Sequence, residues 1–164
     1  MGSLDPMRVR PADATELEKL REVRDLSAHA GCRFVYSPEQ LTAWLNRPLP
    51  EKMLALLNEG YVLVAEEHHE VVGYGALDPA NNEVEAIFVV PSCAGRGIGR
   101  VLLAAIESLA FGLNLANLKL SASLNAVPFY SRAGYVSFAR GTLPLNESLV
   151  LEYESMEKSL GAAV

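Results

Sequence analysis

Cysteine is scarce in this sequence, and the two that occur, Cys32 and Cys93, lie far apart. Neither belongs to a C-x-x-C motif or to a cysteine and histidine spacing that holds zinc. This argues against a disulfide-rich scaffold and against a zinc module, and we expect two free thiols in a reducing compartment. Because Cys93 stands beside a glycine-rich turn, it is a candidate reactive thiol, but a buried thiol is the simpler expectation.

Long apolar runs and basic clusters are also lacking. No run reaches the length of a membrane span and no secretory signal is present, so we expect a cytoplasmic protein with no membrane partner. The net charge is −6, with 14 basic and 20 acidic side chains. Because the basic residues are not clustered, nucleic acid is a poor partner, whereas a cationic substrate such as an amine suits the acidic balance.

A metal-binding motif is missing as well. The nearest approach to one is the pair His68 and His69, in a turn that we expect over residues 67–70. Neighbouring side chains in an extended chain point to opposite faces, so this pair is poorly placed to hold one ion. We therefore expect no metal.

What the sequence does contain is enough apolar side chains for one core. It has 164 residues, half of them hydrophobic, and shows no repeat, linker or low-complexity tract. These features predict one domain, which we place at residues 7–160. Residues 1–6 have the composition of an added expression leader, and we expect the native chain to begin at Met7.

Two capping boxes mark helix starts near the N-terminus. Asp13 is followed three residues later by Glu16, and Ser37 is followed by Gln40 with Pro38 in the first turn. The periodicity predicts helices over about 13–31, from 37 onward and over 53–58. It predicts strands over 7–10, 61–66, 71–77, 83–90, 118–123, 135–139 and 149–156, and a loop over 141–147.

The most informative stretch joins a strand to a helix. Val84 to Val90 is apolar and β-branched, Pro91 ends it, and Gly95, Gly97 and Gly99 follow at every second position. From Ile98 the apolar residues recur at helical spacing. The glycines therefore lie at a helix N-terminus, where free N–H groups favour an anion such as a phosphate.

Two common phosphate motifs do not fit this turn. The dinucleotide pattern G-x-G-x-x-G fails, because its last position falls on Arg100 or Leu102. No G-K-[ST] follows, so a nucleoside triphosphate loop is also excluded. A plain glycine-rich turn between strand and helix remains the structural alternative.

The neighbouring motifs extend the pattern. The stretch Ala94-Gly95-Arg96-Gly97-Ile98-Gly99 resembles the Q/R-x-x-G-x-G/A acetyl-CoA signature of the GNAT (GCN5-related N-acetyltransferase) superfamily. The later N-A-x-x-F-Y run from Asn125 to Tyr130, followed by Gly134-Tyr135, is similar to a second family motif. Ala94 departs from the family's Gln or Arg, so one polar side chain near the phosphates is missing while the backbone N–H groups are retained.

The resemblance implies a fold. It is an α/β fold with a mixed sheet and the element order β-α-α-β-β-β-α-β-α-β-β. In this fold the strands around Val89 and Leu118 run parallel and splay apart at one end. The pantetheine arm of the cofactor lies in the gap and pairs with the strand backbone, as an added strand would.

The resemblance also implies site residues. Val89 would polarise the thioester carbonyl through its N–H, and Tyr130 would be the general acid. Glu85 is a candidate general base that shares strand parity with Glu83, Ile87 and Val89. The cofactor-binding residues would be Phe88, Val89, Val90, Gly95, Arg96, Gly97, Ile98, Gly99, Arg100, Asn125, Phe129 and Tyr130.

Structural alternatives stand beside each assignment. Tyr130 could be a packing residue and Glu85 a solvated one, and a water chain or an already neutral amine would need no base. Tyr36 and Trp44 are candidates for lining an acceptor pocket, although Trp44 fits an amphipathic helix core equally well. Arg96 and Arg100 are candidate phosphate partners or ordinary solvated arginines.

The function that the resemblance implies is acetyl-CoA-dependent transfer of an acetyl group to a primary amine of a small molecule or peptide, by direct attack on the thioester. A non-catalytic CoA-binding regulatory module is the alternative, and a nucleotide-binding or nucleic-acid module is a third. The sequence leaves open the acceptor, the length of the acyl chain and whether the chain forms a homodimer.

Overall fold

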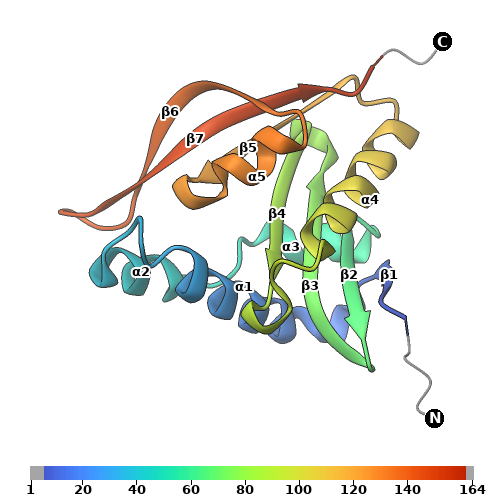
Figure 1. Cartoon of the computed structure of the whole chain (residues 1–164), viewed down its shortest axis with the longest axis horizontal. Coiled ribbons are helices and arrows are strands. Elements are labelled where there is room, and N and C mark those ends of the chain that lie inside the picture. Colours follow the sequence, from blue (N-terminus) through green and yellow to red (C-terminus); the bar gives the residue numbers. More distant parts are fainter. Residues whose placement is uncertain (1–5, 162–164) are drawn as a thin grey trace.

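Seven strands form one mixed sheet in the order β1-β2-β3-β4-β5-β7-β6 (Figure 1). The structure is a computed structural model that describes residues 6–161, so most of the expected leader, residues 1–5, lies outside the described residues. The strands are β1 (Arg8–Pro11), β2 (Val62–Glu67), β3 (Glu70–Asp78), β4 (Glu83–Val89), β5 (Asn117–Ser123), β6 (Val136–Pro144) and β7 (Val150–Ser159).

The helices cover both faces of this sheet. They are α1 (Leu17–Gly31), α2 (Pro38–Leu45), α3 (Lys52–Asn58), α4 (Ile98–Gly112) and α5 (Val127–Arg132). The side chains of α4 and α5, such as Ile106 and Tyr130, pack with Leu118 on one face. On the other face, Leu20 of α1 and Met53 of α3 pack together. This arrangement is the mixed α/β fold that the sequence predicts (Figure 1).

The predicted capping boxes are confirmed. The Asp13 side chain accepts from the N–H of Thr15, and the Glu16 carboxylate accepts from the N–H of Asp13. At the second box the Ser37 hydroxyl accepts from the N–H of Gln40, whose side chain accepts in return from the N–H of Ser37. These bonds satisfy N–H groups that a helix start otherwise leaves without partners.

The predicted loop over 141–147 is wrong in its first half. Strand β6 continues to Pro144, because Gly141 pairs with Tyr153 and Leu143 pairs with Leu151 on β7. Glycine and proline lowered the strand signal of this segment, and the pairing partner overrides that local preference.

The central strands β4 and β5 run parallel and pair at one end. Among the described residues their pairing is confined to Glu83 and Lys119. The two strands therefore separate along most of β4, which confirms the predicted splayed pair. The edge of β4 from Ile87 to Val89 is left open on the side where β5 departs.

No helix within residues 6–161 combines the length and the apolar character that crossing a bilayer requires.

Candidate functional site

The glycine-rich turn begins the site. Gly95 and Gly97 have positive φ angles of 76° and 84°, and Gly97 is the N-cap of α4. The first helical hydrogen bond runs from the N–H of Val101 to the carbonyl of Gly97. The N–H groups of the preceding residues in the first turn therefore have no partner within the helix, and they form a cradle that suits an anion.

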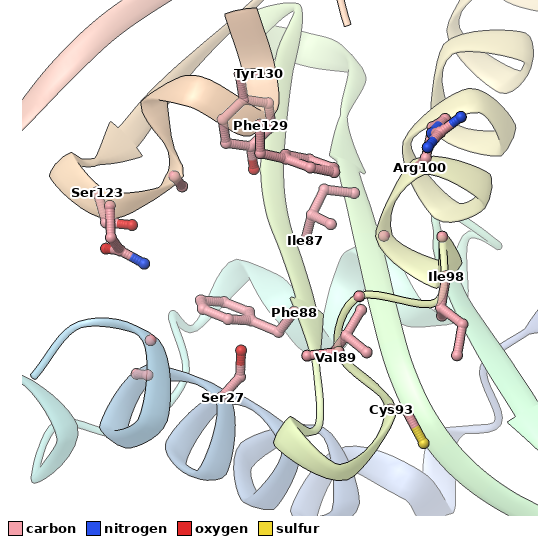
Figure 2. A pocket seen from close by; sticks show the side chains of 18 of the residues that line it. Ser27, Ile87, Phe88, Val89, Cys93, Ile98, Arg100, Ser123, Phe129 and Tyr130 are labelled. Atoms are coloured by element: carbon pink, nitrogen blue, oxygen red, sulfur yellow. The ribbon is translucent and has the colours of Figure 1, made fainter. Parts of the chain in front are cut away.

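A cavity of about 710 Å³ runs from this cradle into the gap beside β4 (Figure 2). In Figure 2 the side chains of Ile87, Phe88 and Val89 follow β4 between Phe129 and Tyr130 on α5 and Ser27 on α1. The predicted cofactor-binding residues that line this cavity are Phe88, Val89, Gly95, Gly97, Ile98, Gly99, Arg100, Asn125, Phe129 and Tyr130. The structure thus brings most of the predicted set to one hollow.

The backbone of β4 presents the N–H of Val89 to this gap. The N–H of Val90 donates to the carbonyl of Val72 on β3 at 2.8 Å, and the carbonyl of Val90 accepts from Cys93 at 3.0 Å. Because N–H groups alternate in direction along a strand, the N–H of Val89 points away from β3. It faces the side where β5 has separated, so Val89 rather than Val90 offers a donor to a ligand there.

Gly99 allows α5 to approach the start of α4. A Cβ atom at this position would lie 3.3 Å from the ring of Phe129 and 3.8 Å from Val89. The glycine is therefore needed for close packing, since its own φ is helical. This packing brings the aromatic end of α5 against the cradle.

Two of the candidate charged residues have different surroundings. Arg100 lines the cavity, whereas Arg96 is not among the lining residues. The guanidinium of Arg96 is held by both carboxylate oxygens of Glu67, at 3.0 and 2.6 Å. Arg100 therefore lies at the site, whereas Arg96 is paired with Glu67 and does not line the cavity.

Sequence reasoning missed Arg132, which also lines the cavity. It lies in the last turn of α5, two residues after Tyr130. Its position two residues after the N-A-x-x-F-Y run is the sequence signal that could have identified it. Together Arg100 and Arg132 provide cationic groups for an anionic ligand, at a site where Ala94 provides none.

Both cysteines are free, as predicted, and both are buried and line the large cavity. The thiol of Cys32 donates to the side-chain oxygen of Asn125 at 3.2 Å. Burial raises the pKa of Cys32, so its thiol stays protonated and is a weak nucleophile at neutral pH.

A second cavity of about 350 Å³ adjoins the first. Tyr36, Trp44 and Glu85 all line it, so the three candidate acceptor-side residues lie in one place. Tyr130 lines both cavities and therefore stands at their junction.

The position of Tyr130 suits a proton donor. Its ring packs edge-on against those of Phe129 and Tyr135, with centroid separations of 5.0 and 5.8 Å. Burial raises the pKa of Tyr130, so the phenol is protonated at neutral pH. The side chain is buried, and it borders both cavities at once.

Glu85 points to a different face from the one that strand parity predicts. The register between β3 and β4 shifts, so that Ala76 pairs with Ala86 while Leu77 pairs with Val84. This β-bulge leaves Glu85 without an opposite residue and reverses the alternation. Val84 and Ile87 consequently pack in the same core cluster, and the predicted shared parity of Glu85 with Ile87 and Val89 is wrong.

The bulge directs Glu85 toward α3. The ammonium of Lys52 lies 2.7 Å from the Glu85 carboxylate and 2.9 Å from that of Asp78. Burial raises the pKa of Glu85, the nearby Glu83 adds to the rise, and the ion pair with Lys52 opposes it. The hydrogen bonds and charges of the two acids outweigh the effect of burial on Lys52 and raise its pKa.

Tyr36 forms a fixed wall of the smaller cavity. Its hydroxyl donates to the carbonyl of Glu152 on β7 and accepts from the N–H of Leu124 at 3.1 Å. The side chain is buried, with both hydrogen-bonding roles of the hydroxyl used by the backbone. It therefore presents its ring to the cavity and keeps its hydroxyl away from a ligand.

Within residues 6–161 no group of three or more His, Cys, Asp or Glu side chains is placed to hold a metal ion. His68 and His69 form the tight turn between β2 and β3, with φ angles of 52° and 64°.

Comparison with known proteins gives a consistent result. The family model described as "Acetyltransferase (GNAT) domain" matches residues 32–142 of this chain. The uncharacterised N-acetyltransferase YjcF of Bacillus subtilis is 30% identical over 92 residues, which cover 55% of this chain and 66% of YjcF. The alignment thus spans just under two thirds of that relative.

Two solved structures are similar over almost their whole length. A GCN5-related N-acetyltransferase from Rhodopseudomonas palustris has a TM-score of 0.84 and 27% identity, covering 97% of this chain and 99% of its own. The PaiA N-acetyltransferase from Thermoplasma acidophilum, in complex with coenzyme A, has a TM-score of 0.77 and 21% identity, with coverage of 94% and 99%.

The ion pair at Glu85 leads to a direct prediction. Replacing Lys52 with methionine removes the cation that stabilises the Glu85 carboxylate, so the pKa of Glu85 should rise further, by about one unit or more. An NMR titration of the Glu85 side-chain carboxyl carbon measures this shift. Lys52→Arg keeps the charge and should stay near the parent value. An unchanged pKa in Lys52→Met would contradict the ion pair.

Proposed function

The chain belongs to the GNAT acetyltransferase family, and we propose that it transfers an acetyl group from acetyl-CoA to a primary amine of a small molecule or peptide. The observation that carries this proposal is the open edge of β4 at Val89 beside the N–H cradle that begins α4. A strand edge suited to an extended pantetheine arm and a helix start suited to a pyrophosphate lie along one cavity.

The residues present fit acetyl-CoA as the cosubstrate. The cradle from Gly95 to Arg100 would bind the pyrophosphate through backbone N–H groups, with Arg100 and Arg132 adding positive charge. Asn125 and Phe129 would contact the cofactor arm from the side of α5. The complex of PaiA with coenzyme A supports this assignment by likeness of fold.

The proposed chemistry needs a donor for the thioester oxygen. Acetyl-CoA supplies an activated acetyl group, and the N–H of Val89 would donate a hydrogen bond to the carbonyl oxygen as negative charge develops on it. A preorganised donor of this kind contributes about 3 kcal/mol to lowering a barrier in other enzymes.

Two side chains would handle protons. Tyr130, protonated and at the junction of the cavities, would donate a proton to the departing thiolate. Glu85, whose pKa burial raises, would accept a proton from the amine in the smaller cavity. The ion pair with Lys52 favours the ionised form of Glu85, which is the form that a base requires.

A cytoplasmic location accompanies the proposal. Both cysteines are free thiols, which a reducing compartment preserves. The cytoplasm also supplies acetyl-CoA.

Acetyl-CoA binding and thiol release together test the function. At 100 times its dissociation constant, acetyl-CoA should stabilise the fold by about 2.7 kcal/mol and raise the melting temperature by several degrees. The same sample should release free thiol with a primary amine. A melting shift without release from any amine would favour a regulatory CoA-binding module. The absence of a shift at saturating acetyl-CoA would contradict the proposal.

Tyr130→Phe tests the proton donor. Losing the phenolic proton should lower kcat by about 100-fold, within the range for general acids, and leave acetyl-CoA affinity unchanged. Steady-state kinetics and calorimetric binding separate the two effects. Tyr135→Phe is a matched control, because Tyr135 is a buried tyrosine beside Tyr130 that is not among the residues lining either cavity. Unchanged turnover in Tyr130→Phe would remove this residue as the acid.

A further inference from the structure

The smaller cavity has walls of two different kinds. Its β4 wall carries the carboxylates of Glu83 and Glu85. The walls from the α1–α2 region and from β7 carry the aromatic rings of Tyr36, Trp44 and Tyr153. The acidic groups that line the cavity are therefore all on β4, whereas the other elements contribute aromatic, aliphatic and hydroxyl side chains.

No cationic side chain lines this cavity among the residues that the structure describes. Lys52 forms an ion pair with Glu85, and it is shared with Asp78. A ligand carboxylate would therefore meet two like charges and no counter-ion, which disfavours amino acids as acceptors. Ser121 and Ser123 on β5 also line the cavity, but their hydroxyls are neutral. A second ammonium far from β4 would therefore meet no carboxylate among the lining residues, which disfavours polyamines.

The aromatic walls are held in place before any ligand binds. Tyr36 is fixed by two backbone partners on separate segments. The side chain of Gln40 on α2 donates to the carbonyl of Val150 at 2.8 Å, and Arg47 after α2 donates to the carbonyl of Pro144 at 2.6 Å. These bonds tie α2 to the β6–β7 hairpin, so the elements that carry the three rings are held relative to one another before a ligand binds.

We infer that the smaller cavity binds an arylalkyl monoamine, with its amine at Glu83 and Glu85 and its ring among Tyr36, Trp44 and Tyr153. This assignment rests on the proposed function and names the acceptor class for the same site. The volume of about 350 Å³ lies at the small end for ligand cavities, which suits one aromatic ring on a short chain. Aromatic stacking would select the ring, and the two carboxylates would select the cation.

A binding experiment tests the inference without requiring turnover. Trp44 is the only tryptophan in the sequence, so its fluorescence reports directly on this cavity. Titration of the full chain, saturated with CoA, with phenethylamine should give a saturable change in emission. Phenylalanine has the same ring and chain with an added carboxylate, and it should bind about 100-fold more weakly or not at all. Equal affinity for the two compounds would overturn the inference.

Turnover provides the second arm. With acetyl-CoA, phenethylamine should give a kcat/KM about 100-fold above those of phenylalanine and spermidine in a thiol-release assay. Faster release with spermidine or with a peptide would overturn the inference and leave the proposed transferase intact. Saturable phenethylamine binding without release from any amine would keep the inferred site and overturn the proposed catalysis. A failure of both arms would overturn the inference.

Two variants localise the effect. Trp44→Leu should raise the KM for phenethylamine about 10-fold through loss of the ring contact, with the KM for acetyl-CoA unchanged. Phe111→Leu is the matched control, because Phe111 is an exposed aromatic residue on α4 that is not among the residues lining either cavity. Glu83→Gln should also raise the KM for phenethylamine. It should reduce the ratio of kcat/KM for phenethylamine to kcat/KM for phenylalanine. Unchanged KM values in both site variants would contradict the assignment.

Discussion

The separation of β4 from β5 is the constraint on which the rest of the structure depends. The two strands pair at Glu83 and Lys119 and then diverge, so β4 keeps an open edge inside the molecule. An open strand edge has unpaired N–H and C=O groups, and burial without partners would be costly. The proposed cosubstrate would supply those partners. The gap would thus join fold and function, because the backbone of β4 would serve as the binding surface.

Electrostatics divides the hollow around this gap into two parts. The larger cavity has the helix N-terminus of α4 with Arg100 and Arg132, which suits phosphates. The smaller cavity has Glu83 and Glu85, which suits a cation. Tyr130 belongs to both, where a proposed proton donor must stand. A negatively charged cosubstrate and a positively charged acceptor would therefore meet from opposite sides of one tyrosine.

Local signals in the sequence predicted the features that depend on local chemistry. The capping residues at Asp13 and Ser37 and the glycine turn before α4 follow from hydrogen-bonding rules that act over a few residues. The side of β4 to which the Glu85 side chain points was not predictable in this way, because the β-bulge that reverses it exists only in the pairing of β4 with β3. The pairing of Arg96 with Glu67 and the approach of Arg132 to the cavity likewise depend on tertiary contacts.

Amide hydrogen exchange at Val89 and Val90 tests the central claim most directly. The N–H of Val90 is bonded to Val72, so it should exchange slowly with or without ligand. The N–H of Val89 should exchange faster in the free protein and become protected at saturating acetyl-CoA. This difference between neighbouring amides would establish that the open edge of β4 holds the cosubstrate. Protection at the α4 cradle with no change at Val89 would contradict the account.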